Sequence, residues 1–238
     1  MTTSVVSSPL SLRHTNLCRN PIPQASCMPS RFFVTGTDTG VGKTVVSALL
    51  CAALEAIYWK PIQTGTREGA DRPTVMRLAG LPRARTAPEA YRFAPPVSPH
   101  LAARRAGVRI DLRKIKMPRI APSENLIAEG AGGALVPINE TQLMTDLMRH
   151  LGLPVLLVTR TTLGTINHTL LSLAALRAAR LDVRGVIMVG KANRDNREAI
   201  ERYGRAAVIG LVPRLARIDR GVLLDVFRKY FDAKAFGA

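Results

Sequence analysis

The sequence predicts an α/β fold in which a mostly parallel sheet carries helices on both faces. Three observations lead there. Short apolar runs typical of buried strands alternate along the chain with longer segments of helical pattern. Hydrophobic residues make up 47% of the chain and aromatic residues only 5%, which favours an aliphatic core like that of a sheet buried on both faces. A glycine-rich turn joins the first apolar run to the first helical segment.

The expected elements follow one another in regular alternation. We expect strands at residues 31–35, 57–60, 125–129, 154–159, 185–189 and 207–212. We expect helices at residues 42–55, 71–79, 98–106, 141–150, 166–179, 194–203 and 219–231. In the third helix Ser98 is a candidate N-cap and Pro99 suits the first turn. The basic stretch 109–124 has no convincing helical pattern.

One domain accounts for most of the 238 residues. No internal repeat or low-complexity linker divides residues 31–238. Residues 1–30 are rich in Ser, Pro and Asn and contain no Asp or Glu, so we expect a disordered or non-functional tail. A transit peptide and a natural start at Met28 are the open alternatives.

The net charge of +17, from 34 basic and 17 acidic residues, indicates an anionic partner such as nucleic acid or a polyphosphate. The arginines are scattered and no nucleic-acid-binding motif is present, so we expect no nucleic-acid partner. No apolar run is long enough to cross a membrane. The three cysteines, Cys18, Cys27 and Cys51, have no metal-ligand spacing, which favours a reducing, cytoplasmic location.

Residues 36–44, GTDTGVGKT, have the pattern of a P-loop, the glycine loop whose backbone N–H groups hold the phosphates of ATP. A strand precedes this loop and a helix follows it, as that role requires. Lys43 would reach the β- and γ-phosphates, and the Thr44 hydroxyl would bind Mg²⁺. The spacing is unusual, because Gly36 lies six residues before Gly42 rather than five.

Two further strand ends carry charged residues. Lys60 ends a short strand before a loop of small residues that includes Thr64. Glu129 ends an apolar strand and is followed by residues 130–133, GAGG. Ligands of open parallel sheets bind at the carboxyl ends of strands. Lys60 is therefore placed to meet an anion, and Glu129 suits a metal ion on the triphosphate.

These motifs together resemble the dethiobiotin synthetase family. The resemblance rests on five segments in order along residues 31–213, namely 36–44, 60–65, 98–100, 129–133 and 163–168. The family's fold is a P-loop NTPase-like α/β domain. Its reaction uses ATP, Mg²⁺ and CO₂ to close the ureido ring of 7,8-diaminopelargonate, through a carbamate and a carbamic–phosphoric anhydride, in biotin biosynthesis. The enzyme is expected to be a cytoplasmic homodimer with sites at the interface.

The resemblance implies a role for each matching residue. Lys43 and Lys60 would be catalytic. The residues that would bind ATP are Thr39, Gly40, Val41, Gly42, Lys43, Thr44, Glu129, Gly130, Gly132, Gly133, Asn193 and Pro213. The residues that would bind the substrate are Thr64, Gly132, Thr165, Ile166 and Asn167. The Mg²⁺ ligands would be Thr44, Asp71 and Glu129.

Several assignments have alternatives. Asp71 is as well explained as a helix N-cap, and His100 as part of a helix start. Asn193 is displaced from the position of the family's adenine-reading asparagine. Two other functions also fit a P-loop domain. One is a partner-switching ATPase of the ParA/MinD kind, which carries an additional lysine where this chain has Asp38. The other is an amide-forming enzyme of the cobyrinic acid type, which needs a glutaminase domain for which no room remains.

Overall fold

The computed structural model describes residues 1, 29–67 and 69–237. The predicted tail at residues 1–30 lies, apart from Met1, Pro29 and Ser30, outside the described residues, and so do Cys18, Cys27 and Met28. The division of the chain at residue 30 therefore stays a prediction.

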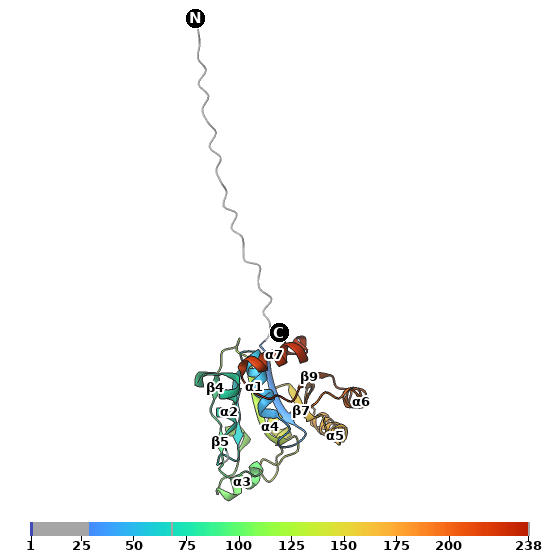
Figure 1. The fold of residues 1–238 in the computed structure, drawn as a ribbon. Helices are drawn as coiled ribbons and strands as arrows, with labels where there is room; N and C mark the ends of the chain where they lie inside the picture. Colours follow the sequence, from blue (N-terminus) through green and yellow to red (C-terminus); the bar gives the residue numbers. More distant parts are fainter. Residues whose placement is uncertain (2–28, 68, 238) are drawn as a thin grey trace.

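A seven-stranded sheet, parallel throughout, forms the centre of the fold (Figure 1). The spatial order of the strands is β4-β2-β6-β1-β7-β8-β9. Their bounds are β1 Arg31–Gly36, β2 Ile57–Trp59, β4 Thr86–Ala87, β6 Leu126–Gly133, β7 Val155–Arg160, β8 Val183–Val189 and β9 Val208–Val212. A separate parallel pair joins β3, Ile62–Gln63, to β5, Tyr91–Arg92. The predicted fold class is confirmed.

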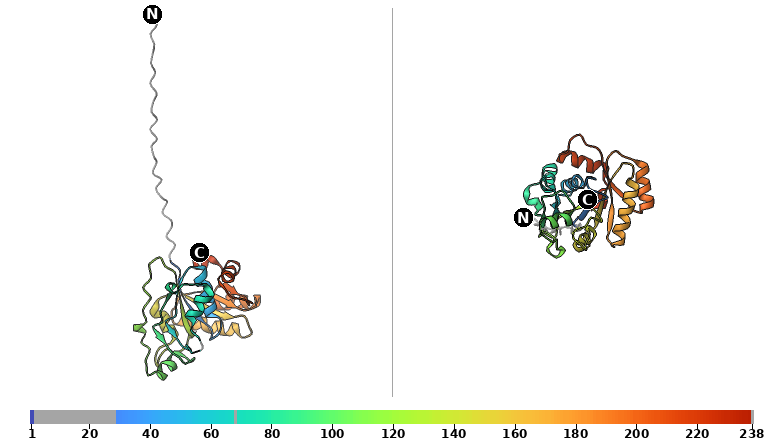
Figure 2. Two further views of the ribbon diagram at one scale, coloured as in Figure 1. Left: turned by 60° about the vertical axis from the view of Figure 1, so that its left-hand side comes forward. Right: turned by 90° about the horizontal axis from the view of Figure 1, so that it is seen from below.

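Helices cover both faces of the sheet, as the two views of Figure 2 show. The helices are α1 Lys43–Ala53, α2 Asp71–Ala79, α3 Pro99–Arg105, α4 Met144–Leu151, α5 Thr165–Ala178, α6 Arg194–Gly204 and α7 Arg220–Tyr230. Short 3-10 turns lie at Arg83–Arg85, Leu112–Lys114 and Ala233–Phe236. Across the part of the chain that the structure describes, no helix has the length and apolar character that a bilayer span requires.

Two hydrophobic clusters form the core, one on each face. Strand β1 contributes side chains to both clusters, because successive side chains of a strand point to opposite faces. Phe33 packs in the cluster that includes buried residues of α4, α5 and α6. Phe32 and Val34 pack in the cluster that includes buried residues of α1, α2 and α7. The sheet is thus the middle layer of three. Loops lie along the edge at which its strands have their carboxyl ends.

The turn between β1 and α1 depends on Gly42. This residue is the N-cap of α1 and has φ 102°, a left-handed conformation that side chains other than glycine rarely adopt. The helix then begins at Lys43, one residue later than predicted. The turn brings the N-terminus of α1 to the carboxyl end of β1, where a phosphate-binding loop is expected.

Two local expectations are corrected, and a third, Ser98 as N-cap, is confirmed in position but without a side-chain capping bond. The helix predicted from residue 141 begins at Met144, because the Asn139 side chain accepts hydrogen bonds from the N–H groups of Thr141 and Gln142 and holds them in a turn. Ser98 occupies the N-cap position of α3, but its side chain makes no capping bond and instead pairs with His100 Nδ1 at 3.0 Å. Asp71 is not an N-cap, since Ala70 holds that position in α2.

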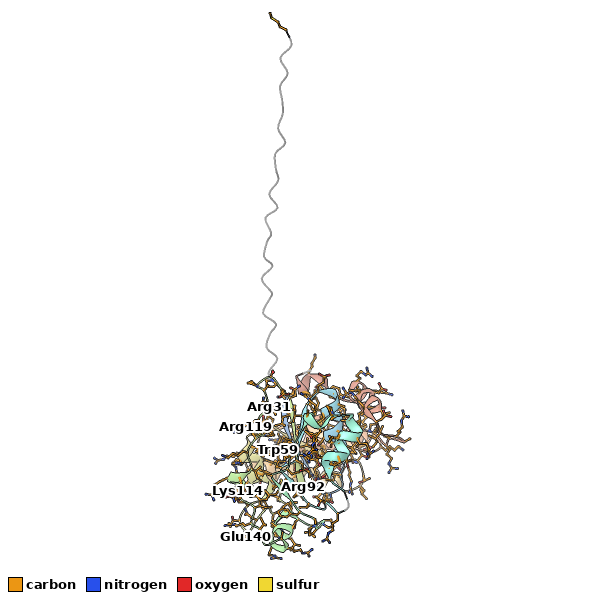
Figure 3. The ribbon with its side chains drawn as sticks, turned by 90° about the vertical axis from the view of Figure 1, so that its left-hand side faces the viewer. Arg31, Trp59, Arg92, Lys114, Arg119 and Glu140 are labelled. Carbon is orange, nitrogen blue, oxygen red and sulfur yellow. The ribbon has the colours of Figure 1, made fainter. Side chains whose placement is uncertain are left out.

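The basic stretch 109–124 forms a strap along one flank, with only the 3-10 turn at Leu112–Lys114 as regular structure. Arg31 fastens its end by donating to the carbonyl oxygens of Ala121, Pro122 and Glu124. Figure 3 shows Arg31, Arg119 and Lys114 along this flank. The sequence expectation that this region has no long helix is confirmed.

Candidate active site

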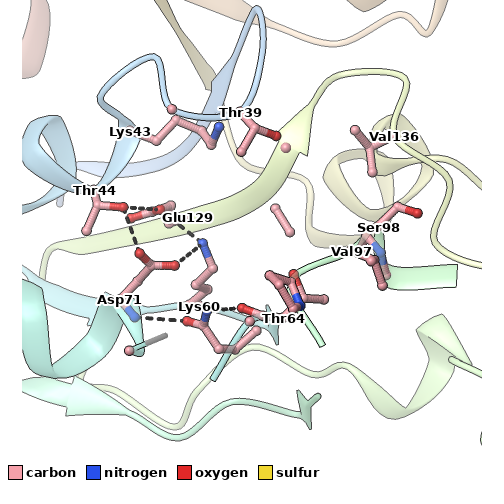
Figure 4. A pocket seen from close by; sticks show the side chains of 18 of the residues that line it. Thr39, Lys43, Thr44, Lys60, Thr64, Asp71, Val97, Ser98, Glu129 and Val136 are labelled. Carbon is pink, nitrogen blue, oxygen red and sulfur yellow. Dashed lines mark hydrogen bonds and ion pairs between the residues drawn. The ribbon is translucent and has the colours of Figure 1, made fainter. Parts of the chain in front are cut away.

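A cavity of about 540 Å³ lies at the carboxyl ends of the central strands (Figure 4). The P-loop, the end of β6 and the segments after β2 and β5 surround it. The residues that line it are Thr39, Gly40, Gly42, Lys43, Thr44, Val45, Lys60, Gln63, Thr64, Gly65, Gly69, Asp71, Pro96, Val97, Ser98, Pro99, Glu129, Ala131, Gly132 and Val136. One cavity therefore brings together the three charged groups that the sequence predicts at the carboxyl edge of the sheet, namely Lys43, Lys60 and Glu129.

Lys60 stands between two carboxylates at one end of the cavity. Its Nζ lies 2.7 Å from Asp71 Oδ2 and 3.0 Å from Glu129 Oε1, and it donates a third bond to the Gly130 carbonyl at 3.3 Å. Thr44 joins the same group, since its hydroxyl lies 3.0 Å from Asp71 Oδ1 and 2.9 Å from Glu129 Oε1. Residues distant in the sequence thus form one connected cluster.

The cluster sets the ionisation of its members. Burial alone would lower the pKa of Lys60, but the carboxylates of Glu129 and Asp71 outweigh it and hold the pKa above its ordinary value. Burial would raise the pKa of Asp71, yet the ion pair with Lys60 and hydrogen bonds from Thr44 and Gln63 lower it. Lys60 is therefore a cation and Asp71 an anion at neutral pH.

Lys43 is folded back onto its own loop. Its Nζ donates to the Asp38 carbonyl at 2.8 Å, and only 7% of the residue is exposed. Burial lowers the pKa of Lys43 to about 8, with the charge of Lys60 adding to that effect and the carboxylate of Glu129 opposing it. An arriving phosphate would give this ammonium the counter-charge that the carbonyl does not supply.

Tyr58 is a site residue that the sequence reasoning missed. It is fully buried in β2 and donates its hydroxyl hydrogen bond to Glu129 Oε2 at 3.0 Å. Burial and the Glu129 carboxylate raise the pKa of Tyr58 well above its ordinary value, so it stays a donor. Nothing in the local sequence marks Tyr58, because its partner lies 71 residues away. The only signal would have been the pairing of β2 with β6, the strand of Glu129, and the sequence alone did not predict that pairing.

The predicted ATP-binding residues divide between two cavities. Thr39, Gly40, Gly42, Lys43, Thr44, Glu129 and Gly132 line the first. Val41 and Asn193 line a second cavity of about 540 Å³, beyond the P-loop at the ends of β7 and β8. Asn193 also caps α6 by accepting a bond from the Asn196 N–H at 2.9 Å. Gly130, Gly133 and Pro213 line neither cavity.

The predicted substrate-binding residues also separate. Thr64 and Gly132 line the first cavity, whereas Thr165, Ile166 and Asn167 do not. Those three form the first turn of α5, in which Thr165 is buried and donates to the Arg160 carbonyl. His100 likewise lies outside the lining of the cavity.

The donor set suits Mg²⁺ that arrives with phosphates. Within residues 29–67 and 69–237, no three His, Cys, Asp or Glu side chains are grouped as metal ligands. The Thr44 hydroxyl and the carboxylates of Asp71 and Glu129 nevertheless place hard oxygen atoms about one point. Mg²⁺ commonly takes one or two carboxylates and completes its shell with water and substrate phosphates. The residues present therefore fit the ion.

In the described part of the chain, no cysteine thiol is available to the cluster as a nucleophile. Cys51, the cysteine of the described residues, is completely buried in α1, and burial raises the pKa of its thiol. Such a thiol is inert, which agrees with chemistry by positioning and charge rather than by a cysteine adduct.

Comparisons with known proteins show the family of the chain. The family model described as an AAA domain matches residues 30–221. The chain is 47% identical over 205 residues to the ATP-dependent dethiobiotin synthetase of Novosphingobium aromaticivorans, covering 86% of this chain and 98% of that protein. It is 46% identical over 209 residues to the synthetase of the same name from Agrobacterium fabrum, covering 88% and 98% of the two chains.

Solved structures resemble the fold at much lower identity. A ParA family ATPase from Chlorobium tepidum matches with a TM-score of 0.50 and 12% identity, over 80% of this chain and 86% of that one. The MinC:MinD complex of Aquifex aeolicus matches with a TM-score of 0.50 and 15% identity, over 79% and 82% of the two chains. At these identities the likeness shows the fold alone, whereas the sequence relatives decide the family. The chain belongs to the ATP-dependent dethiobiotin synthetases, which are ATP-dependent ligases.

Proposed function

We propose that the chain joins 7,8-diaminopelargonate and CO₂ to form dethiobiotin, through a carbamate that ATP phosphorylates. The observation that carries this proposal is the position of Lys60. It lies between Asp71 and Glu129 in the same cavity as the P-loop residues Lys43 and Thr44. A site built in this way can hold a phosphate chain, its metal ion and an anionic nucleophile together.

The chemistry requires three bond-forming steps. One amine of the substrate adds to CO₂ and loses a proton, which gives a carbamate. A carbamate oxygen then attacks the γ-phosphorus of ATP and displaces ADP. The second amine attacks the carbamate carbon of the resulting anhydride, closes the ring and expels phosphate with loss of a proton. Positioning and charge stabilisation are what such a sequence asks of a protein.

Two lysines would supply the positive charge. Lys43 leaves the Asp38 carbonyl, at 2.8 Å, for the β- and γ-phosphates. Lys60 turns its ammonium from the two carboxylates toward the γ-phosphate and the carbamate, both anionic. Because Lys60 is only 5% exposed, its charge acts at low local dielectric, where it is worth more than in water.

Mg²⁺ would be held by Thr44, Asp71 and Glu129. When bound, it neutralises the charge that develops on the β- and γ-phosphates. The hydroxyl of Tyr58 keeps the second oxygen of Glu129 engaged, so that its first oxygen faces the cavity.

The far end of the cavity suits an aliphatic substrate. Val97 and Val136 line it with Ser98, away from the charged cluster, as Figure 4 shows. Thr64 and the N–H groups near Gly132 are available to the substrate head and the carbamate oxygen. A carbon chain with both of its amines at one end matches this division of the cavity.

A second copy of the chain would complete the substrate site. The first turn of α5 lies outside the cavity, and its Thr165 N–H donates to the Thr162 carbonyl at 3.1 Å, yet the N–H groups of Ile166 and Asn167 at this helix N-terminus suit the tail carboxylate of the substrate. Large apolar side chains are exposed close by, namely Leu163, at 104% relative exposure, and Leu171, at 61%. An apolar surface of this kind favours a protein partner. We therefore propose a homodimer, in the cytoplasm, in which α5 of one protomer faces the cavity of the other.

The dimer proposal predicts complementation. A Lys60→Ala protomer and an Asn167→Asp protomer, each inactive alone, should regain dethiobiotin formation when mixed, because one of the two shared sites is then intact. Sedimentation analysis should give twice the chain mass. A monomer, or a mixture without activity, contradicts the shared site.

The overall function is tested directly by product formation. Purified protein with diaminopelargonate, bicarbonate, Mg²⁺ and ATP should yield dethiobiotin and ADP in equal amounts, measured by mass spectrometry. Diaminopelargonate should stimulate ATP hydrolysis only when bicarbonate is present. ATP hydrolysis that responds to DNA and not to diaminopelargonate would instead favour a ParA/MinD-like switch.

A further inference from the structure

The two cavities of the P-loop meet at Gly40 and Gly42, which line both of them. The first contains the cluster of Lys60, and the second is lined from the loops that follow β7, β8 and β9. Neither the sequence motifs nor the proposed chemistry assigns a role to Arg160, which lines the second cavity.

The positions of the two cavities fix where the phosphates of a bound nucleotide would pass from one cavity to the other. This step rests on the proposed function, which places the γ-phosphate beside Lys43 and Lys60. The nucleoside then falls in the second cavity, where Asn193 lies. The α- and β-phosphates must pass over the glycines that the two cavities share.

Arg160 stands at that crossing. It is the last residue of β7, and two residues earlier Val158 pairs with Gly36 at the start of the P-loop. Its Nη2 lies 3.4 Å from the Thr39 carbonyl oxygen. The same nitrogen is 3.5 Å from the point where Gly40 would carry a Cβ atom. The guanidinium thus lies against the open side of the loop.

The Arg160 side chain is free to change partners. Its hydrogen bond to the Thr39 carbonyl oxygen, at 3.4 Å, is long. Among the ion pairs of residues 29–67 and 69–237, none involves Arg160. Its backbone, in contrast, is held, because Thr165 donates to its carbonyl. In a chain of net charge +17, unpaired arginines are common, so position rather than lack of a partner singles out this one.

We infer that Arg160 binds the α- and β-phosphates of the nucleotide and positions the triphosphate over the P-loop. The planar fork of a guanidinium can donate to two phosphate oxygens at once, which a lysine ammonium cannot do in a fixed geometry. Gly40 has φ 70° and no side chain, and so leaves the approach open. Arg160 would then fix the direction of the triphosphate, while Lys43 binds its γ-phosphate end.

A ligand series tests this role. Calorimetry at fixed ionic strength would compare wild type, Arg160→Gln and Arg160→Lys for ATP, ADP and adenosine. The glutamine variant should bind ATP and ADP about 10-fold or more weakly, as expected for a lost hydrogen bond to a charged group. Adenosine affinity should not change, and lysine should restore only part of the loss.

Arg119→Gln is the matched control, because Arg119 is also exposed, has no ion pair among the described residues and lies on the flank shown in Figure 3. If both glutamine variants lose the same amount of affinity for ATP, Arg160 acts only through the general positive charge of the protein, and the inference is overturned. Unchanged ATP affinity in Arg160→Gln, or an equal loss for adenosine, would also overturn it. Dethiobiotin formation by the wild type is scored separately, so that failure of the proposed function and failure of this inference remain distinguishable.

Discussion

Single side chains determine the charge in the cavity. Lys43 and Lys60 are both nearly buried, and each has a replaceable partner: a backbone carbonyl for Lys43 and two carboxylates for Lys60. Neither lysine is needed to fill the hydrophobic core. Their burial therefore serves these polar contacts rather than packing, and both ammonium groups stay available to an anion.

Lys43→Ala and Lys60→Ala should each lower the kcat of dethiobiotin formation by at least about 100-fold, the scale on which one group that stabilises transition-state charge acts. Circular dichroism should show that both variants keep the fold. Turnover like that of the wild type in either folded variant would contradict the assigned role.

Tyr58→Phe removes one hydrogen bond without changing the packing. The buried Oε2 of Glu129 then loses its donor, which should cost about 1–3 kcal/mol of unfolding free energy. The Mg²⁺ concentration needed for half-maximal activity should rise, since Glu129 is held less firmly. Urea unfolding and a metal titration measure the two effects, and Tyr230→Phe, on the exposed side of α7, serves as the control.

The pKa of Lys43, about 8, predicts the pH dependence of ATP binding. ATP binds better to the charged lysine, so the affinity for ATP without Mg²⁺ should be constant below about pH 8. It should fall as the pH rises through that value and Lys43 loses its proton. Calorimetry from about pH 6.5 to 9.5 measures this, and Lys43→Arg, whose side chain stays charged, should bind with no such fall.

At the scale of elements, three buried hydroxyls join β7 to α5. Thr159 Oγ1 lies 2.8 Å from the hydroxyls of both Thr165 and Thr169, and the Thr165 hydroxyl also donates to the Arg160 carbonyl. This trio fixes the start of α5 against the end of β7. It therefore places both the N-terminal turn of the helix and the backbone of Arg160.

Thr159→Val keeps the shape of the side chain but removes two of these bonds. Because Thr169 is then left buried with no hydroxyl partner, we expect a loss of about 1–3 kcal/mol in unfolding free energy. Denaturant unfolding measures it. Thr162→Val, at an exposed position, should change stability by less than about 0.5 kcal/mol. If Thr159→Val and Thr162→Val are equally stable, the three buried hydroxyls do not have this structural role.

The sequence predicted the long elements and the short strand β2, but none of the two-residue strands. Strands such as β1 and β7 contain apolar runs, and each main helix follows from its pattern and flanking residues. The two-residue strands β3, β4 and β5 are too short for any period to appear. They form only because the neighbouring chain supplies partners, which a local pattern does not contain.

At the scale of the whole molecule, the motifs predicted which residues meet but not how they bond. Strand ends in one parallel sheet share an edge, so the meeting of Lys43, Lys60 and Glu129 followed from topology. The ion pair of Lys60 with Asp71 did not, because Asp71 comes from a helix whose distance depends on the preceding loop. The roles proposed for Tyr58 and Arg160 depend on contacts across the sheet and were invisible in the sequence.

Deletion of residues 2–27 should leave dethiobiotin formation near that of the wild type. Every residue placed in the two cavities lies between Thr39 and Arg214. Ser30, whose N–H donates to Asn125 Oδ1 at 2.7 Å, is retained. Steady-state kinetics of the shortened protein measure the effect, and a large fall in kcat would assign the tail a role in turnover.

The place of Lys60 between two carboxylates also bears on the order in which ligands arrive. Before any nucleotide enters, the ammonium offsets one of the two negative charges of Asp71 and Glu129, so a free divalent ion meets a cluster whose charge is already reduced. An ion that comes in on ATP brings phosphate oxygens with it, and these give the displaced lysine a new counter-charge. The metal and the nucleotide are thus expected to bind as one unit, with Lys60 acting as an exchangeable counter-ion that keeps the empty cavity assembled between turnovers.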